Sequence, residues 1–197
     1  FNVALEELLR QVVRSHKRIL FDGDNYSDAW KKEAAKRGLP NLTGTPEALK
    51  ALISPETIAL FERYGVLTVR ELKSRYEAYL HAYESTVALE ASCALTMANT
   101  MILPAAMACE RDLAATLAAG KGLSAHAGLK KIAKAVAAHT DELVAAIGRT
   151  EKALESHDAA KTLAAMAALR KAGDALEEHV PSDLWPLPTY GDMFFLL

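Results

Sequence analysis

The feature that most constrains the fold is one long apolar run, Thr86 to Cys109, inside a longer stretch of helical pattern. That pattern begins at Thr68, where Glu71 three residues later completes a capping-box signature, and it continues to about Ala119. Within the apolar run the polar face almost disappears, which is typical of a helix buried on several sides. We therefore predict one long central helix, kinked where Pro104 removes a backbone donor.

The composition agrees with an all-α fold. Hydrophobic residues make up 51% of the chain but aromatic residues only 7%, so most of the apolar content is Ala and Leu, which favour helices. Two further long amphipathic patterns, about Ser124 to Glu155 and Ala159 to Val180, follow the central one. We predict an all-α helical bundle in which these two long helices pack antiparallel with the central helix.

The segment before the central helix predicts shorter helices. An amphipathic helix is expected over Asn2 to Leu20, a turn over 22–25, and a short helix over Ser27 to Arg37 that stops at Gly38. Two more short helices are predicted where an N-cap residue, a first-turn proline and an acid occur together: Thr45-Pro46-Glu47 and Ser54-Pro55-Glu56.

The C-terminal segment is rich in large apolar groups, and its prolines exclude a helix over Leu184 to Tyr190. We predict an extended apolar docking tail that lies across the bundle or docks on another domain or subunit. Its candidate interface residues are Trp185, Pro186, Pro188, Tyr190, Phe194 and Phe195. The chain is thus expected to form one structural domain in three parts: 1–67, 68–180 and the tail, 181–197.

Charge and cysteine content exclude several classes of function. The net charge is only −2 and acids and bases are interspersed, so no extended basic surface exists to bind nucleic acid. Cys93 and Cys109 lie in an apolar helical stretch, where a free cysteine behaves as a small hydrophobe, which suits a reducing cytoplasm. Glu90, Asn99 and Pro104 interrupt the apolar run, so we do not predict a membrane span.

No catalytic, cofactor-binding or metal-binding residue is predicted. The sequence contains no zinc-protease, zinc-ribbon, P-loop or α/β-hydrolase motif, and no Glu-x-x-His pair of a di-iron bundle. Four acids, Asp22, Asp24, Asp28 and Glu33, partly match a calcium-loop register. Tyr26 and Ser27 stand where that motif needs an oxygen ligand and Gly, so we interpret the segment as a plain turn.

One acid in the apolar run, Glu90, is the candidate buried polar residue. Burial would raise its pKa or require a cationic partner, and we favour a structural ion pair. The candidate partners are Arg75, Lys130, Lys131 and Arg170. An independent helical enzyme that uses Glu90 and His81 is a further alternative, which would need a polar cavity between the helices.

Several segments together resemble the C-terminal region of type III glutamine synthetases, the large bacterial form of that enzyme. They agree with it in order and spacing, and the tail motif Trp-Pro-x-Pro-Thr-Tyr-Gly-Asp is the most specific. The matching segments are 15–27 with Trp30, 36–42, 61–67, 74–80, the run from Glu90 to Ala105, and 184–193. The middle, roughly Ala114 to Ala165, matches only in helical character.

The resemblance implies a subunit of an ATP-dependent glutamate–ammonia ligase of nitrogen metabolism that assembles into large rings. Its ATP- and magnesium-binding residues would lie in a catalytic domain upstream of residue 1, and since residue 1 is Phe we expect a fragment. The segment would then be an accessory and assembly domain without catalysis of its own. Its partners would be the catalytic domain and neighbouring subunits of a homo-oligomer. The alternative is a free-standing helical adaptor that binds a partner helix in an apolar groove.

Overall fold

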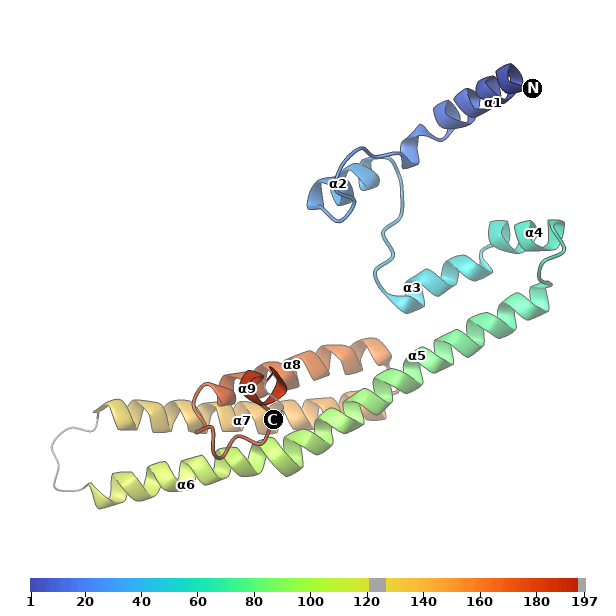
Figure 1. The fold of residues 1–197 in the computed structure, drawn as a ribbon. Helices are drawn as coiled ribbons and strands as arrows, with labels where there is room; N and C mark the ends of the chain where they lie inside the picture. The colour runs from blue at the N-terminus through green and yellow to red at the C-terminus, as the bar shows by residue number, and fades with distance from the viewer. Residues whose placement is uncertain (121–126, 195–197) are drawn as a thin grey trace. The chain divides into compact units, whose positions relative to one another are not determined.

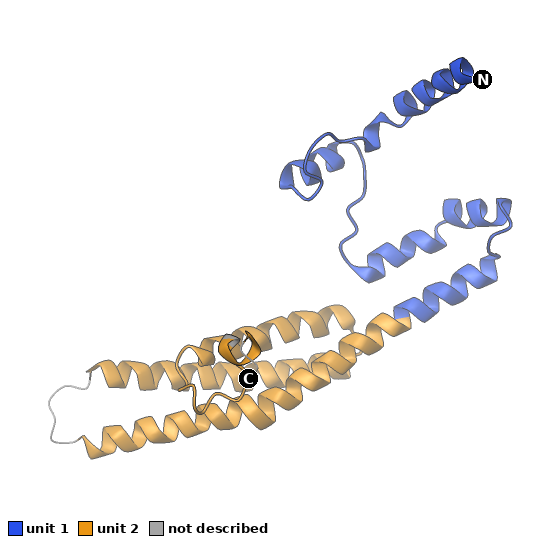
Figure 2. Cartoon of the chain, in the orientation of Figure 1, with its two compact units in different colours: residues 1–80 blue, residues 81–197 orange. Residues whose placement is uncertain are grey.

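Every regular element that the computed structural model describes is helical, which confirms the all-α prediction. The described residues are 1–120 and 127–194. They belong to two compact units, 1–80 and 81–197 (Figure 2). The sequence suggested a boundary before the long helix, at 67/68. In the structure the boundary falls inside that helix, whose first turns, with the fully buried Leu72, group with the N-terminal elements.

The first unit holds the four predicted helices, the first of which ends at Ser15 and not at Leu20, and two short 3-10 turns, η1 and η2, that were not expected. They are α1 Asn2–Ser15, η1 Lys17–Ile19, α2 Asp28–Lys36, α3 Thr45–Lys50, η2 Ala51–Ile53 and α4 Pro55–Arg63 (Figure 1). α1 is amphipathic as expected, but none of its residues is buried. Its apolar side, which includes Leu8 and Val12, is therefore without a core partner among the described residues.

Local capping chemistry sets the ends of these helices. The side chains of Ser27 and Ser54 accept hydrogen bonds from the backbone N–H of Trp30 and Thr57 and cap α2 and α4. The cap of α3 differs from the expectation. Thr45 is the first helical residue and Pro46 is the second. The N-cap is therefore Gly44, which has no side chain to accept a capping hydrogen bond.

Two glycines end helices in the left-handed conformation. Gly38 follows α2 with φ of 68°, and Gly65 follows α4 with φ of 63°. A residue with a Cβ is strained at such a φ, whereas glycine is not. At the second of these turns the N–H of Val66 donates to the carbonyl of Phe61, which closes the end of α4.

The long central helix is present and begins where predicted. It consists of α5 Val69–Met97, a π-helical turn η3 Ala98–Ile102, and α6 Leu103–Ala119. The capping box forms as expected. Thr68 N–H donates to Glu71 Oε2 at 2.8 Å, and Glu71 N–H donates to Thr68 Oγ1 at 3.3 Å. The hydrogen bonds that the Thr68 backbone N–H and then the Thr68 hydroxyl donate to the carboxylate hold the pKa of Glu71 below its ordinary value.

The irregularity expected at Pro104 is a wide turn that comes before the proline. The N–H of Leu103 donates to the carbonyl of Ala98, five residues earlier, so one residue is added to this turn of the helix. Pro104 then occupies the first turn of α6, where its missing N–H costs least.

The second unit is a bundle of long helices. α7 Ala127–Glu155 packs against α6 and α8 Ala159–Glu177 and runs antiparallel to both (Figure 1). The antiparallel prediction is thus confirmed for α7, whereas α8 runs parallel to the central helix. The expected start of α7 at Ser124 lies outside the described residues. Between α7 and α8, His157 adopts a positive φ of 52°, and the Asp158 carboxylate caps α8 by accepting from Lys161 N–H at 3.0 Å.

Small residues dominate the core of this bundle. Leu143 and Leu176 are fully buried, but many of the other buried positions are alanine. Three buried threonine hydroxyls, those of Thr140, Thr150 and Thr162, each donate to a backbone carbonyl four residues earlier, so none needs a cross-helix partner. Small side chains let the helix axes approach closely, which compensates for the low aromatic content.

The tail begins with a hydrogen-bonded turn, in which the N–H groups of Leu184 and Trp185 both donate to the carbonyl of Pro181 at 3.0 Å, and its described part ends in a short helix. Leu184 and Trp185 pack against the bundle core. Beyond them, Thr189 and Asp192 form a second capping box, with Thr189 N–H donating to Asp192 Oδ2 at 2.8 Å, and α9 Tyr190–Phe194 follows. The prediction of a non-helical tail over Leu184 to Tyr190 holds through Thr189 and is wrong at Tyr190, where the unexpected α9 begins.

Candidate interaction surface

The tail residues predicted to form an interface divide into two groups. Trp185 and Pro186 are half-buried, and Trp185 packs on the core of its own bundle. Its indole Nε1 is buried without a hydrogen-bond partner among the described residues. Pro188 and Phe194 are exposed, the latter at 73%. The side chains of Tyr190 and Phe195 lie outside what the structure describes.

Glu90 is not buried, contrary to the expectation. It lies on the exposed side of α5, while the neighbouring Ala91 is fully buried. The expectation failed because the scarcity of polar residues around Glu90 does not mean that the bundle surrounds the helix. The bundle covers only the inner side of α5 in this unit.

The outer side of the long helix carries the least polar exposed surface of the bundle. From Ala91 to Cys109 the sequence contains no Asp, Glu, Lys, Arg or His. We define the uncharged face as the exposed uncharged residues in and next to this stretch: Leu89, Ser92, Cys93, Thr96, Asn99, Thr100, Met101, Pro104 and Met107. Leu89 is 71% exposed and Met107 is 59% exposed, which is unusual for large apolar side chains in such a run.

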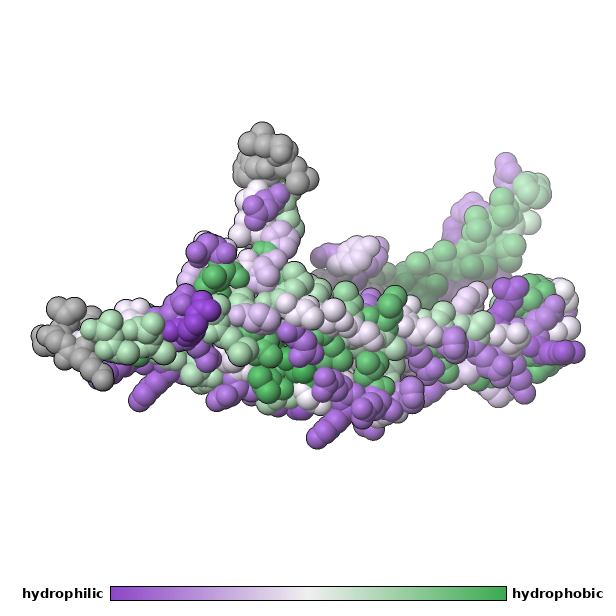
Figure 3. Space-filling view, turned by 90° about the horizontal axis from the view of Figure 1, so that it is seen from below, coloured by the Kyte–Doolittle hydropathy of each residue, from purple (hydrophilic) through white to green (hydrophobic). Residues whose placement is uncertain are grey.

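The hydroxyl groups of the uncharged face are satisfied within their own helix. The hydroxyls of Ser92, Thr96 and Thr100 each donate to the backbone carbonyl four residues earlier, at 2.9, 2.9 and 2.6 Å. The face therefore has little need for polar contacts and costs little to dehydrate. Figure 3, which views the side of α5 and α6, shows hydrophobic residues gathered there between hydrophilic ones.

The long helix also meets the simplest criteria for a membrane span. Val69–Ala119 contains an 18-residue window with a mean hydropathy of 1.4, of which 22% is buried within this structure. Core helices of water-soluble proteins pass the same test, so length and composition alone are weak evidence for a membrane. The low buried share does show that most of this window is uncovered within the described residues.

The motif residues of the first unit form a local clamp. The guanidinium of Arg37 donates from Nη1 to the carbonyl of Leu20 at 2.6 Å and from Nε to Glu33 Oε1 at 2.7 Å. It also lies over the ring of Trp30, at 5.7 Å, and that ring stacks on Phe21 with centroids 4.6 Å apart. The hydrogen bond from Arg37 lowers the pKa of Glu33. These contacts fix the turn before α2 to the C-terminal end of α2. We call Leu20, Phe21, Trp30, Glu33 and Arg37 the clamp.

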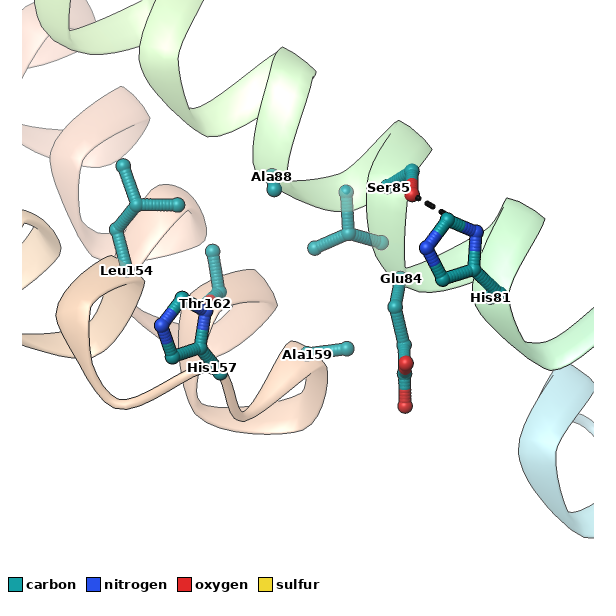
Figure 4. A pocket seen from close by; sticks show the side chains of 9 residues that line it. His81, Glu84, Ser85, Ala88, Leu154, His157, Ala159 and Thr162 are labelled. Atoms are coloured by element: carbon teal, nitrogen blue, oxygen red, sulfur yellow. Dashed lines mark hydrogen bonds between the residues drawn. The ribbon is translucent and has the colours of Figure 1, made fainter.

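A cavity of about 260 Å³ lies between α5 and the α7–α8 turn. Its walls carry the polar side chains of His81, Glu84, Ser85, His157 and Thr162 (Figure 4). A 3.5 Å hydrogen bond joins His81 Nδ1 and Ser85 Oγ, and the Thr162 hydroxyl is already bonded to the Asp158 carbonyl. Glu90 does not line the cavity, so the structure does not bring Glu90 and His81 together there.

The described residues do not assemble a recognisable centre for chemistry. Among residues 1–120 and 127–194, no group of three or more His, Cys, Asp or Glu side chains is placed to hold a metal ion. Two acids of the partial calcium register pair with basic residues instead, Glu33 with Arg37 and Asp28 with Lys31. Burial raises the pKa of Cys109, which disfavours its nucleophilic thiolate form. The uncharged face is therefore the main candidate for function.

Comparison with known proteins gives this helical chain a family. Residues 4–121 match the family described as the glutamine synthetase C-terminal domain. A glutamine synthetase of Butyrivibrio fibrisolvens is 35% identical over 209 residues, a length that covers 98% of this chain and 30% of that relative. A type-3 glutamine synthetase of Dictyostelium discoideum is 30% identical, with 98% and 29% covered. A glutamine synthetase of Bacteroides fragilis (strain YCH46) is 26% identical, with the same coverage.

The chain thus spans about 30% of the length of these relatives. The resemblance drawn from the motifs is confirmed, because the family match includes the clamp of Arg37, the α4–α5 turn and the long helix. Its most specific tail motif lies beyond the matched residues but within the segment aligned to the relatives. The chain belongs to the glutamine synthetase C-terminal domain family.

Proposed function

We propose that this chain is an accessory and assembly domain of a type III glutamine synthetase. The rest of the protein would ligate ammonia to glutamate at the expense of ATP, with magnesium bound there, and these helices would make no covalent chemistry of their own. The observation that carries the proposal is the alignment of 98% of this chain with about 30% of relatives named glutamine synthetases.

The arrangement of the site residues supports a structural role. Residues of the segments that resemble the family have structural roles. Arg37 belongs to the clamp, Gly65 ends α4, and Trp185 packs on the core of the second unit. The uncharged face, in contrast, is built to be covered, because it is apolar and its hydroxyls are satisfied internally. We place the enzyme in the cytoplasm as a homo-oligomer, in which such faces become buried.

The proposal is tested in the natural full-length protein with the double variant Thr96→Lys, Thr100→Lys. Two buried ammonium groups would be costly in an interface but harmless on a solvated surface. We expect the variant to show reduced ammonia-dependent glutamine formation compared with the unsubstituted protein. The matched control is Ala137→Lys, which adds a charge to the exposed side of α7 between Lys134 and Asp141. A parent protein that forms no glutamine, or a double variant that behaves as the control, would contradict the proposal.

A helical adaptor is the second candidate, and the exposure of α1 favours it. Six large apolar residues of α1 are at least 40% exposed, as in a helix that awaits a partner groove: Val3, Leu5, Leu8, Leu9, Val12 and Val13. The same activity measurement separates the two functions, because an adaptor would form no glutamine.

A further inference from the structure

The uncharged face is one-sided, and its inner side is already packed. Ala91 and Ala98 are at most 1% exposed, and Leu95 is 9% exposed, so the bundle covers the inward positions of the same turns. The outward positions at Leu89, Cys93 and Thr100 are exposed. Any additional partner must therefore bind from outside, against one face of a helix that is fixed by its own bundle.

The small area of this face limits what can bind it. From Leu89 to Met107 an α-helix is about 28 Å long and about 10 Å wide, which gives a strip of about 300 Å². A standard stable interface buries about 800 Å² on each partner. The strip is too small to hold two freely diffusing copies of the chain together by itself. A partner tethered in the same polypeptide needs far less area, because tethering raises its effective concentration.

Charges at the ends of the strip also argue against a symmetric pair and against lipid. Glu90 lies at one end, and Arg111 at the other is already paired with the adjacent Asp112 at 3.1 Å. In an antiparallel pair of copies, Glu90 would meet both signs of charge at the opposite end, with no net attraction. Insertion of this face into a membrane would also bring charged residues of α7, such as Lys134 and Asp141, into the lipid, because α7 packs against the same long helix.

The relatives supply a tethered partner. They extend over about three times the length of this chain, so most of each relative lies outside the aligned segment. We propose that the uncharged face is covered by the remainder of the same polypeptide, through an apolar surface that makes few hydrogen bonds to it. This proposal rests on the assembly role above and names its partner as the protein's own catalytic part, in cis.

The residues of the face fit such a contact. Ser92, Cys93, Thr96 and Thr100 are small, so a helix or strand can approach the backbone closely. Met101 and Met107 are flexible and fill irregular gaps. Because the hydroxyls already have acceptors, the covering surface does not have to supply them.

A photo-crosslinking experiment tests the proposal in the natural full-length protein. Leu89, at the rim of the face, is replaced by p-benzoylphenylalanine in a ¹⁵N-labelled population, which is assembled with an equal amount of unlabelled, unsubstituted protein. After irradiation, mass spectrometry identifies the crosslinked peptides and the isotope of each. We expect peptides from outside residues 1–197, with both members labelled. The control carries the photo-reactive residue at Ala137 and should give none of these products.

The other outcomes are distinct. Crosslinks from labelled to unlabelled peptides would overturn the cis assignment, and if the unlabelled peptide came from residues 81–120 they would identify a second copy of this face. Crosslinks to lipid, or none above the Ala137 control, would overturn it as well. In each of these cases ammonia-dependent glutamine formation, measured on the same samples, reports separately whether the proposed function still holds.

Discussion

Arg37 shows how a single residue can explain a family motif. Its side chain joins the carbonyl of Leu20, the carboxylate of Glu33 and the face of Trp30. Only a guanidinium, with several donors in one plane and a surface that stacks on aromatic rings, satisfies all three at once. The motif segments 15–27 and 36–42 are thereby linked by one side chain.

Replacing Arg37 with Leu should destabilise the first unit by about 2 kcal/mol, because charge-assisted hydrogen bonds to backbone carbonyls are lost. Arg37→Lys should recover less than half of that loss, since an ammonium keeps the charge but not the fork. Hydrogen exchange of the amides between residues 18 and 38 measures the effect. Equal protection in all three proteins would contradict the clamp.

Gly38 supplies the second prediction at this scale. A Cβ in its left-handed conformation, with φ of 68°, should cost about 1 kcal/mol in Gly38→Ala. The control is Gly148→Ala, inside α7, where a Cβ meets open space and should stabilise the helix by about 0.5–1 kcal/mol. Urea unfolding of both variants shows whether each substitution lowers or raises the free energy of unfolding. A stabilising Gly38→Ala would show that this φ is not adopted in solution.

At the scale of elements, the sequence was most informative about helix ends. Ser54 and Thr68 were identified as caps because capping involves residues three or four positions apart, whereas the cap predicted at Thr45 was wrong. The π-turn η3 was not foreseen. It lies where the chain packs against α7 and α8, and local patterns do not reveal such contacts.

The Asp158 cap gives a pH-dependent prediction. The hydrogen bond from Lys161 N–H lowers its pKa in the folded chain below the ordinary 3.8. A lowered folded pKa means that this stabilisation is fully present above about pH 3.8 and is lost as the pH falls through the folded value. Asp158→Asn should therefore be less stable than the parent at pH 7, with the difference closing at pH 3.

Urea unfolding midpoints at the two pH values measure the difference. Asp158→Ala serves as the reference, because it removes the cap at both pH values and should stay below Asp158→Asn throughout. A difference between parent and Asp158→Asn that is the same at pH 7 and pH 3 would rule out the carboxylate as its source.

For the molecule as a whole, the two compact units have separate reporters. Trp30 belongs to the first unit and Trp185 packs on the core of the second. Leu143 is fully buried in the second core, so Leu143→Ala should cost about 2–5 kcal/mol there. In single-tryptophan variants the fluorescence transition of Trp185 should move to lower urea, whereas that of Trp30 should move little. An equal shift of both would mean that the units unfold as one.

The largest error of the sequence interpretation also belongs to this scale. The apolar run predicted a helix buried on several sides, but Glu90 and Leu89 are exposed in the chain itself. The composition of a helix does not show which of its sides the rest of the chain covers. The exposure of the uncharged face is therefore the feature of the long helix that the sequence pattern did not predict.

The most direct measurement of that burial uses two cysteines already present. Cys93 lies on the uncharged face and is exposed in this chain, whereas Cys109 is buried in the bundle. Maleimide labelling with peptide mapping gives the rate at each thiol in the 197-residue chain and in the natural full-length protein. We predict rapid labelling of Cys93 in the short chain and labelling at least tenfold slower in the full-length protein, with Cys109 slow in both. Equally rapid labelling of Cys93 in both proteins would contradict the claim that this face is covered.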